Sequence, residues 1–194
     1  MTPIDIKVAS DVDEDQAIAV AVQAFSTDPL MRWAMPDPHQ FLEVFPAYLR
    51  AVAGRAFDHR SAYYIDGFRG SAFWLPPGIS FDEEAAIDVL QRNVAPDRLE
   101  EILALMERVG KYHPTQPHWY LPFMAVEARF QRKGLGSSLM RHALMPCDHD
   151  GTLAYLEASS RENLALYERH GFEVLATVQC GTCPPLFPMV RKPR

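Results

Sequence analysis

One short segment limits the possible folds of this chain more than any other, because it joins an apolar strand to a helix through a basic loop. Residues 118–126 are predicted to form the strand and residues 134–144 the helix. Between them, Gln131-Arg-Lys-Gly134-Leu-Gly136-Ser137-Ser138 carries two glycines and two cations. Glycines allow close backbone approach, and the unpaired N–H groups at a helix N-terminus attract anions. The segment therefore predicts an oxyanion site, for which a pyrophosphate is the natural ligand.

The charge of the whole chain indicates that this anion site is local. The 194 residues carry 19 Lys and Arg against 25 Asp and Glu, which gives a formal net charge of −6. Residues 129–141 nevertheless contain Arg129, Arg132, Lys133 and Arg141 and no acid. Because an acidic protein is not attracted as a whole to nucleic acid or to anionic lipid, we expect neither as a partner.

Length and cysteine content favour one domain in a reducing compartment. A chain of 194 residues lies within the ~100–200 that are usual for one domain. One of its longest apolar runs, Trp119–Val126, has eight residues, far fewer than the ~18–20 that span a bilayer. The start of the sequence lacks the basic and apolar regions of a signal peptide. Three cysteines are too few for a disulfide scaffold, so we expect a cytoplasmic protein.

Hydrophobic spacing along the rest of the chain predicts alternating strands and helices. Strands are expected at residues 5–9, 61–65, 68–75, 118–126, 153–158, 172–178 and 186–190, and helices at 13–25, 41–52, 82–91, 96–109, 134–144 and 161–170. The stretch 28–38 contains three prolines and is expected to be a loop, and Pro146 is expected to end a helix. Ser159 and Glu162 have the spacing of a capping box. The pattern predicts an α/β (α+β) fold with one mixed sheet of about seven strands flanked by helices.

Other known phosphate and metal motifs fit the sequence poorly. The pattern of a Walker loop is absent. Gly134-x-Gly136 precedes Glu157 by about the spacing of a dinucleotide fingerprint, but Leu139 stands where the third glycine is needed. Cys180-Gly-Thr-Cys183 lacks the second ligand pair of a structural zinc site. We therefore expect no metal.

The basic segment and the chain that follows it resemble the GNAT superfamily of N-acetyltransferases. Gln131-x-x-Gly134-x-Gly136 after an apolar strand is similar to motif A, which binds the pyrophosphate of acetyl-CoA in that superfamily. The later Leu156-Glu-Ala-Ser-Ser-Arg-Glu-Asn163-Leu-Ala-Leu-Tyr167-Glu-Arg-His-Gly171-Phe172 is similar to a strand, an Asn-x-x-x-Tyr helix and a Gly-Phe exit of the same family. The resemblance covers residues 119–190, and its spacing is closest to the puromycin N-acetyltransferase branch.

This resemblance implies an organisation of the chain and a set of cofactor contacts. It implies a GNAT-like acyl-CoA N-acyltransferase fold over residues 1–194, with an acetyl-CoA-binding core at about 118–192 and an acceptor-side half at about 1–117. The strand next to the core strand is expected to splay away and leave a cleft for the thioester. The implied cofactor-binding residues are Met124, Ala125, Val126, Gln131, Arg132, Lys133, Gly134, Leu135, Gly136, Ser137 and Asn163.

The resemblance also implies a reaction, in which an amine of a small molecule attacks the acetyl carbonyl directly and no covalent enzyme intermediate forms. The Val126 amide is then the oxyanion donor, and Tyr167 protonates or hydrogen-bonds the departing thiolate. Glu157 is the candidate base, directly or through water, and a role only in orientation stays open. Two alternatives remain, a CoA-binding domain without turnover and a protein or peptide N-acetyltransferase. The expected partners are acetyl-CoA and a small amine, and the chain is expected to be a monomer or a homodimer.

Overall fold

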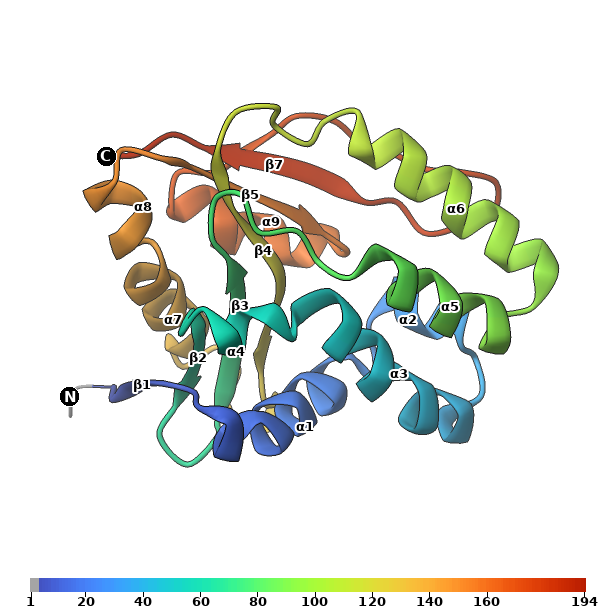
Figure 1. Ribbon diagram of the computed structural model, residues 1–194, viewed down its shortest axis with the longest axis horizontal. Helices are drawn as coiled ribbons and strands as arrows, with labels where there is room; N and C mark the ends of the chain where they lie inside the picture. Colours follow the sequence, from blue (N-terminus) through green and yellow to red (C-terminus); the bar gives the residue numbers. More distant parts are fainter. Residues whose placement is uncertain (1–3) are drawn as a thin grey trace.

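A single mixed sheet organises the protein, with its strands in the order β1-β2-β3-β4-β5-β7-β6 (Figure 1). The computed structural model describes residues 4–194, and residues 1–3, part of the region considered for a signal peptide, lie outside it. Within residues 4–194 the seven strands are β1 (Ile6–Val8), β2 (Ala62–Ile65), β3 (Gly70–Leu75), β4 (His118–Val126), β5 (Leu153–Ala158), β6 (Glu173–Val174) and β7 (Phe187–Arg191). Neighbouring strands are antiparallel except β4 and β5, which are parallel. The predicted fold class is thus confirmed.

Helices cover both faces of the sheet. They are α1 (Glu14–Phe25), α2 (Pro29–Ala34), α3 (Pro38–Ala53), α4 (Arg55–Asp58), α5 (Glu83–Asn93), α6 (Pro96–Gly110), α7 (Leu135–Ala143), α8 (Met145–His149) and α9 (Arg161–Arg169), with short 3-10 turns η1 (Asp11–Asp13) and η2 (Ala128–Phe130). Apolar residues of α1 and α3 pack on one face, around Phe73 and Phe123. Those of α7 and α9 pack on the other, around Trp74 and Leu156.

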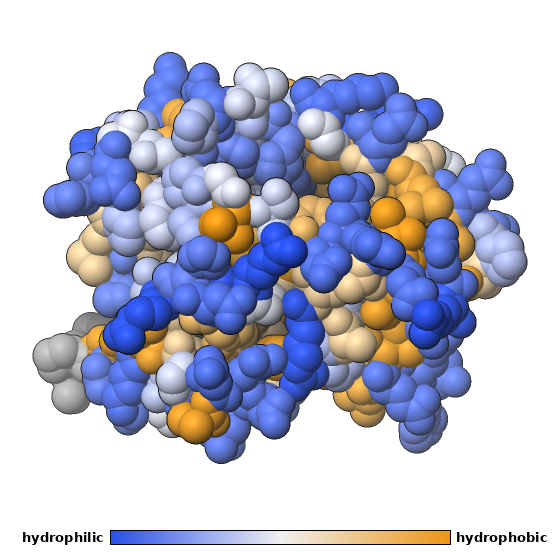
Figure 2. Space-filling view, viewed as in Figure 1, coloured by the Kyte–Doolittle hydropathy of each residue, from blue (hydrophilic) through white to orange (hydrophobic). Residues whose placement is uncertain are grey.

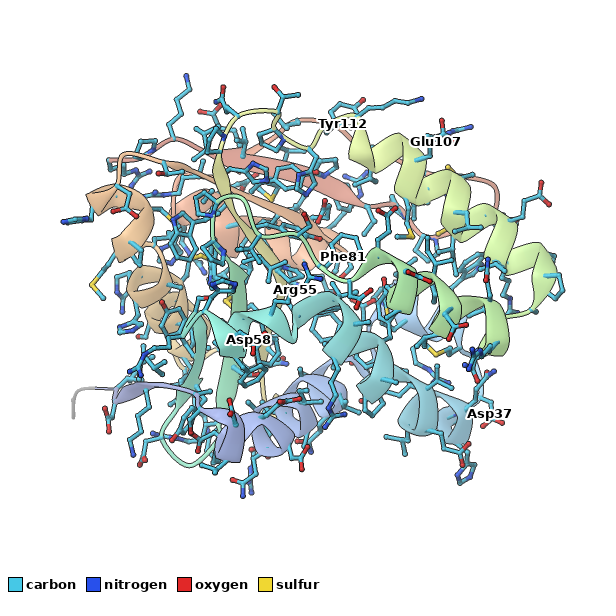
Figure 3. All side chains as sticks on the ribbon, viewed as in Figure 1. Asp37, Arg55, Asp58, Phe81, Glu107 and Tyr112 are labelled. Carbon is cyan, nitrogen blue, oxygen red and sulfur yellow. The ribbon has the colours of Figure 1, made fainter. Side chains whose placement is uncertain are left out.

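Helices α5 and α6 extend the first of these layers. Arg55 of α4 donates a hydrogen bond to the Ser80 carbonyl at 2.8 Å, and Figure 3 shows Arg55 close to Phe81 between α4 and α5. Hydrophobic residues remain visible in Figure 2 on the side of the molecule where α5 and α6 lie. No helix within residues 4–194 is long and apolar enough to cross a lipid bilayer.

The expectation that residues 28–38 form a loop is wrong, because two of its prolines begin helices. Pro29 and Pro38 lie in the first turns of α2 and α3. N–H groups in the first turn make no intrahelical hydrogen bond, so the N–H that proline lacks is not needed there. The aspartate before each proline caps the helix, since Asp28 accepts from the Leu30 and Met31 amides and Asp37 from the His39 amide. Each Asp-Pro pair is therefore a helix start signal.

Other boundaries also differ from the sequence-based expectation. Residues 172–178 form only the two-residue strand β6 and, at Val178, an isolated bridge to Leu186. Helix α7 ends at Ala143, just before Pro146, as expected, but a further short helix, α8, begins at Met145. The cap of α9 is Ser160, whose hydroxyl accepts from the Glu162 amide, so the predicted capping box at Ser159 is wrong.

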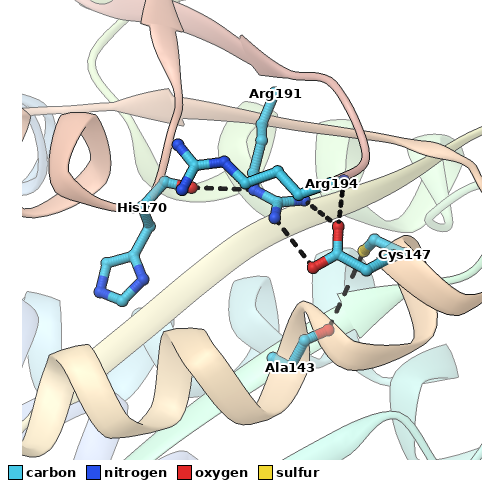
Figure 4. Close-up of polar contacts among 6 residues, drawn as sticks. Ala143, Cys147, His170, Arg191 and Arg194 are labelled. Carbon is cyan, nitrogen blue, oxygen red and sulfur yellow. Dashed lines mark hydrogen bonds and ion pairs between the residues drawn. The ribbon is translucent and has the colours of Figure 1, made fainter.

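An ion pair between a buried arginine and a half-buried aspartate joins the end of the sheet to two helices (Figure 4). The Arg191 side chain of β7 is 4% exposed and donates to both carboxylate oxygens of Asp148 in α8, at 2.8 and 2.9 Å. Its Nε donates to the carbonyl oxygen of His170, directly after α9, at 2.8 Å. A bidentate guanidinium–carboxylate pair fixes orientation as well as distance. The pair therefore holds α8, β7 and the end of α9 together.

We expect Asp148→Ala to lower the free energy of unfolding by about 2–4 kcal/mol, because it leaves the Arg191 charge buried without a counter-ion. Urea denaturation at pH 7 measures this loss. Asp150→Ala, which removes an exposed partner of His149, is the matched control and should cost less than about 0.5 kcal/mol. Arg191 lowers the pKa of Asp148, so its contribution is present at neutral pH and is lost as pH falls through that lowered pKa. Equal stability of the two variants at pH 7 would contradict the assignment.

Candidate active site

Strands β4 and β5 separate part of the way along their length. Their parallel pairing runs from His118 opposite Leu153 to Leu121 opposite Leu156 and stops there. Beyond that point β4 continues to pair with β3, and β5 continues to pair with β7. The separation expected between these two strands is present. It leaves one backbone edge of β4 facing an open space.

The hydrogen-bond phase of β4 determines which backbone groups face that space. The Glu127 amide donates to the Arg69 carbonyl at 3.1 Å, and in an antiparallel ladder alternate residues bond to the same neighbour. Ala125 therefore bonds toward β3, whereas Met124 and Val126 turn their N–H and C=O groups away from it. The Val126 carbonyl accepts from Gln131 Nε2 at 3.1 Å, in agreement with this phase.

A β-bulge in β4 sets the side-chain directions near the separation. Tyr120 lies opposite Leu75 and Phe123 opposite Phe73, so β4 has one more residue than β3 over this stretch. Without the bulge, Tyr120 and Phe123 would point to opposite faces. With it, both pack on the α1 and α3 face, while Leu121 and Met124 pack on the other.

A cleft of about 500 Å³ lies where the strands separate. It is lined by the end of β4, the basic loop, the start of α7, the residues before α2 and one side of α9. The predicted site residues that line it are Met124, Ala125, Val126, Gln131, Arg132, Gly134, Leu135, Gly136, Ser137, Asn163 and Tyr167. Two predicted residues, Lys133 and Glu157, are not among its lining.

The basic loop has the backbone of an anion site. Gly134 adopts a φ of +82° as the N-cap of α7, a conformation that favours glycine. The first helical hydrogen bond runs from the Ser138 amide to the Gly134 carbonyl. The amides of Leu135, Gly136 and Ser137 therefore precede any intrahelical acceptor and are available to a ligand in the cleft.

Lys133 lies outside the cleft because it packs on an aromatic ring. Its Nζ lies 5.4 Å from the centroid of Phe130, and the Arg129 guanidinium lies 4.9 Å from the same ring. Both are cation–π distances. Lys133 is exposed, so its charge acts at the rim of the loop and through solvent.

A histidine that sequence reasoning missed supports the loop from α9. The Ser137 hydroxyl lies 2.6 Å from His170 Nε2. Burial, together with nearby arginines, lowers the pKa of His170, so the ring is neutral at pH 7 and its tautomer sets which of the two groups donates. The contact links the start of α7 to the end of α9 and joins segments too far apart in sequence for a spacing rule to find.

Tyr167 lies in the cleft wall one helical turn after Asn163. Its side chain is 8% exposed and rests against Phe172. Burial and the nearby Asp28 carboxylate raise the pKa of its phenol to about 12. The hydroxyl therefore stays protonated at neutral pH and can donate a hydrogen bond.

Asp28 is the second residue that sequence reasoning missed. It lines the cleft, and its carboxylate accepts hydrogen bonds from the Ser159 hydroxyl and from the Leu30 and Met31 amides. Ser159 is free for this contact because Ser160 caps α9. Burial raises the pKa of Asp28. The Asp-Pro sequence that begins α2 is the signal that could have located it.

Glu157 lies on the face of β5 that α3 approaches, beside Tyr48, Tyr120 and Tyr155. Burial raises the pKa of its carboxyl group to about 7, while the facing hydroxyls of Tyr120 and Tyr155 act against that rise. The carboxylate is therefore close to half protonated at neutral pH. This is the acid–base range in which a general base operates.

Comparison with known proteins shows which family the second half of the chain resembles. Residues 97–174 match the sequence model of the acetyltransferase (GNAT) domain. The chain is 23% identical to an uncharacterised N-acetyltransferase of Schizosaccharomyces pombe over 198 aligned residues, which cover 93% of this chain and 80% of that protein. These matches support the membership of the GNAT superfamily that the motifs predicted, and with it acetyltransferase activity.

Solved structures agree with this fold. A Corynebacterium glutamicum protein described as a histone acetyltransferase and related acetyltransferase superposes with a TM-score of 0.70 at 22% identity, over 98% of this chain and 97% of that one. Arylalkylamine N-acetyltransferase 2 of Aedes aegypti gives a TM-score of 0.67 at 13% identity, over 100% of both chains. Members of the superfamily take acetyl-CoA as the acetyl donor.

A pair of matched glycine variants tests the anion site. Gly134 and Gly78 have φ values of +82° and +84°, and a Cβ at either would meet no atom within 4 Å. We expect Gly134→Val and Gly78→Val to lose similar stability from backbone strain, about 1–2 kcal/mol. Only Gly134→Val should lose CoA affinity, by about tenfold or more, because it alone disturbs the cleft amides. Calorimetric titration with CoA measures the difference, and equal affinities in the two variants would place the pyrophosphate elsewhere.

Proposed function

We propose that this acetyltransferase transfers the acetyl group of acetyl-CoA to a primary amine of a small molecule, by direct attack and without a covalent enzyme intermediate. The observation that carries the proposal is the cleft at the β4–β5 separation, which brings together a free backbone edge, a helix N-terminus and a tyrosine hydroxyl. The Aedes aegypti neighbour, named for arylalkylamines, is consistent with a small acceptor.

The cofactor-binding part of the proposal rests on backbone groups. Met124 and Val126 would pair with the pantetheine amides as an added strand, while Gly134, Leu135, Gly136 and Ser137 would hold the pyrophosphate through their amides. Gln131 donates a hydrogen bond to the Val126 carbonyl and so fixes its orientation. Arg132 would supply charge at the phosphates, Lys133 would do so from the rim, and Asn163 would meet the pantetheine arm or the phosphates.

Direct transfer is supported by the absence of a thiol in the cleft. Cys147, Cys180 and Cys183 are all buried, and among residues 4–194 no cysteine lines the cleft. The Val126 amide, which turns away from β3, would donate to the developing oxyanion. Free buried thiols also fit the reducing cytoplasm proposed for this protein.

Tyr167 is proposed to act on the leaving group, the CoA thiolate. A phenol with a pKa of about 12 is a weaker acid than a thiol with a pKa of ~8.5, so complete proton transfer to the thiolate is uphill. The hydroxyl would therefore stabilise the thiolate mainly by donating a hydrogen bond.

Glu157 is proposed to accept the amine proton, because its carboxyl group titrates near neutrality. Asp28 is a second carboxylate close to Tyr167, but three hydrogen bonds already occupy its oxygens. A domain that only binds CoA would need neither Tyr167 nor a base, so turnover separates the two alternatives.

We expect Tyr167→Phe to leave the CoA dissociation constant nearly unchanged, because the ring and the helix are retained. Turnover, measured as thiol release from acetyl-CoA, should fall. A fall of about 10²–10⁴ marks proton transfer, and a smaller fall marks hydrogen bonding alone. Thermal unfolding serves as the control, since a lost buried hydrogen bond costs about 1 kcal/mol. Unchanged turnover would remove Tyr167 from the mechanism.

The pH dependence of kcat/KM distinguishes Glu157 from Asp28 as the base. A base must be unprotonated, so kcat/KM should rise with pH through about 7, the pKa of Glu157. Glu157→Gln should lose about 10²-fold in kcat/KM and lose this rise as well. Asp28→Asn should keep the rise near pH 7. If Asp28→Asn abolishes the rise and Glu157→Gln keeps it, Asp28 is the base.

A further inference from the structure

The surroundings of Glu157 are aromatic on every element that approaches it. Tyr48 comes from α3, Tyr120 from β4 and Tyr155 from β5, and we call these three residues with Glu157 the tyrosine cluster. The rings of Tyr120 and Tyr155 lie 6.0 Å apart. Burial, and after it the negative charge of Glu157, raises the pKa of all three phenols.

Two polar groups of the tyrosine cluster lack a partner within residues 4–194, one a hydrogen-bond partner and the other a cation. The Tyr155 hydroxyl is buried and has no hydrogen-bond partner of normal geometry. The groups that act on the Glu157 carboxyl are tyrosine hydroxyls and a backbone amide, and no lysine or arginine is among them. A buried carboxylate without a cation is unfavourable unless something else supplies the positive charge.

The loop that follows α6 does not supply this charge. The His113 ring lies 4.4 Å from Tyr155, 4.9 Å from Tyr120 and 4.8 Å from His118. Burial and the neighbouring His118 lower the pKa of His113 to about 4. His113 is therefore a neutral ring at pH 7 and adds a further aromatic surface.

A series of rings connects the cleft to the tyrosine cluster. Phe25 lines the cleft and packs edge-on against Phe123, with centroids 5.3 Å apart and planes at 86°. Phe123 in turn packs against Tyr48 at 6.4 Å and 81°. Tyr48, Tyr120 and Glu157 each keep part of their surface exposed, so the cluster is open to solvent.

We propose that the tyrosine cluster binds the ammonium group of the acceptor, and that the acceptor is a monoamine with one positive charge on an aromatic or otherwise flat apolar skeleton. This inference rests on the proposed amine acetylation and names its substrate class. Tyrosine faces attract a cation, and a carboxylate neutralises it. The edge-on phenylalanines would then contact the skeleton.

The same cluster disfavours other amines. A diamine brings a second charge, and Asp28, the other carboxylate of the site, already accepts three hydrogen bonds. An amino acid brings a carboxylate that Glu157 repels. A peptide amine brings polar backbone groups that aromatic rings cannot satisfy.

The test measures thiol release from acetyl-CoA with 2-phenylethylamine, putrescine, β-alanine and triglycine at one pH. We expect kcat/KM for 2-phenylethylamine to exceed each of the others by about tenfold or more. Tyr48→Leu should raise KM for 2-phenylethylamine about 5- to 30-fold and leave KM for acetyl-CoA unchanged. Tyr48→Phe keeps the ring and should restore KM to within about threefold of the original. Tyr64→Leu, a change at a β2 tyrosine stacked on Phe68, is the matched control and should not alter the preference.

A second readout does not depend on turnover. With CoA bound, 2-phenylethylamine should raise the melting temperature, and Tyr48→Leu should abolish that rise. If no amine releases thiol but this shift occurs and depends on Tyr48, the proposed reaction is wrong and the ammonium site stands. If thiol is released but putrescine or triglycine is preferred, or Tyr48→Leu changes nothing, the acetyltransferase stands and the inferred substrate class is overturned. If there is neither thiol release nor a thermal shift, both are overturned.

Discussion

The end of hydrogen bonding between β4 and β5 is the constraint on which the rest of the site depends. The backbone groups that two neighbouring strands turn toward each other are paired by hydrogen bonds, so a cleft can open between the strands only where that pairing stops. Here it stops after Leu121 and Leu156, while β4 stays paired with β3 and β5 stays paired with β7. The open edge, the basic loop and the start of α7 then follow one another along the chain.

Two kinds of surface meet at this opening. The side toward α7 offers peptide amides and a helix N-terminus, which suit a phosphorylated ligand. The side toward α3 offers tyrosine and phenylalanine rings and one carboxylate. The bulge in β4 brings Tyr120 and Phe123 to the same face and so gives the second side its aromatic character.

The sequence could predict the parts of the site that are local. The spacing of Gln131, Gly134 and Gly136 located the loop, and the strand and helix around it were placed within a residue or two. Asp28, the Ser137–His170 contact and the tyrosine cluster could not be found in this way. Each joins residues from distant segments, and Asp28 was further hidden because its proline suggested a loop where it begins a helix. Glu157 was named from the sequence as the candidate base, but the positions of the three tyrosines around it depend on tertiary packing.

The β3–β4 ladder has a consequence for how the protein can move. Its paired residues run from Gly70 opposite Val126 to Leu75 opposite Tyr120, and they connect the first half of the chain to the second half. The two halves are therefore parts of one continuous sheet, with no flexible linker between them. A hinge rotation that moved one half away from the other would have to break the hydrogen bonds of this ladder. Entry and exit of both substrates must depend on smaller displacements, of side chains and of the helices that rest on the sheet, while the strands stay in place.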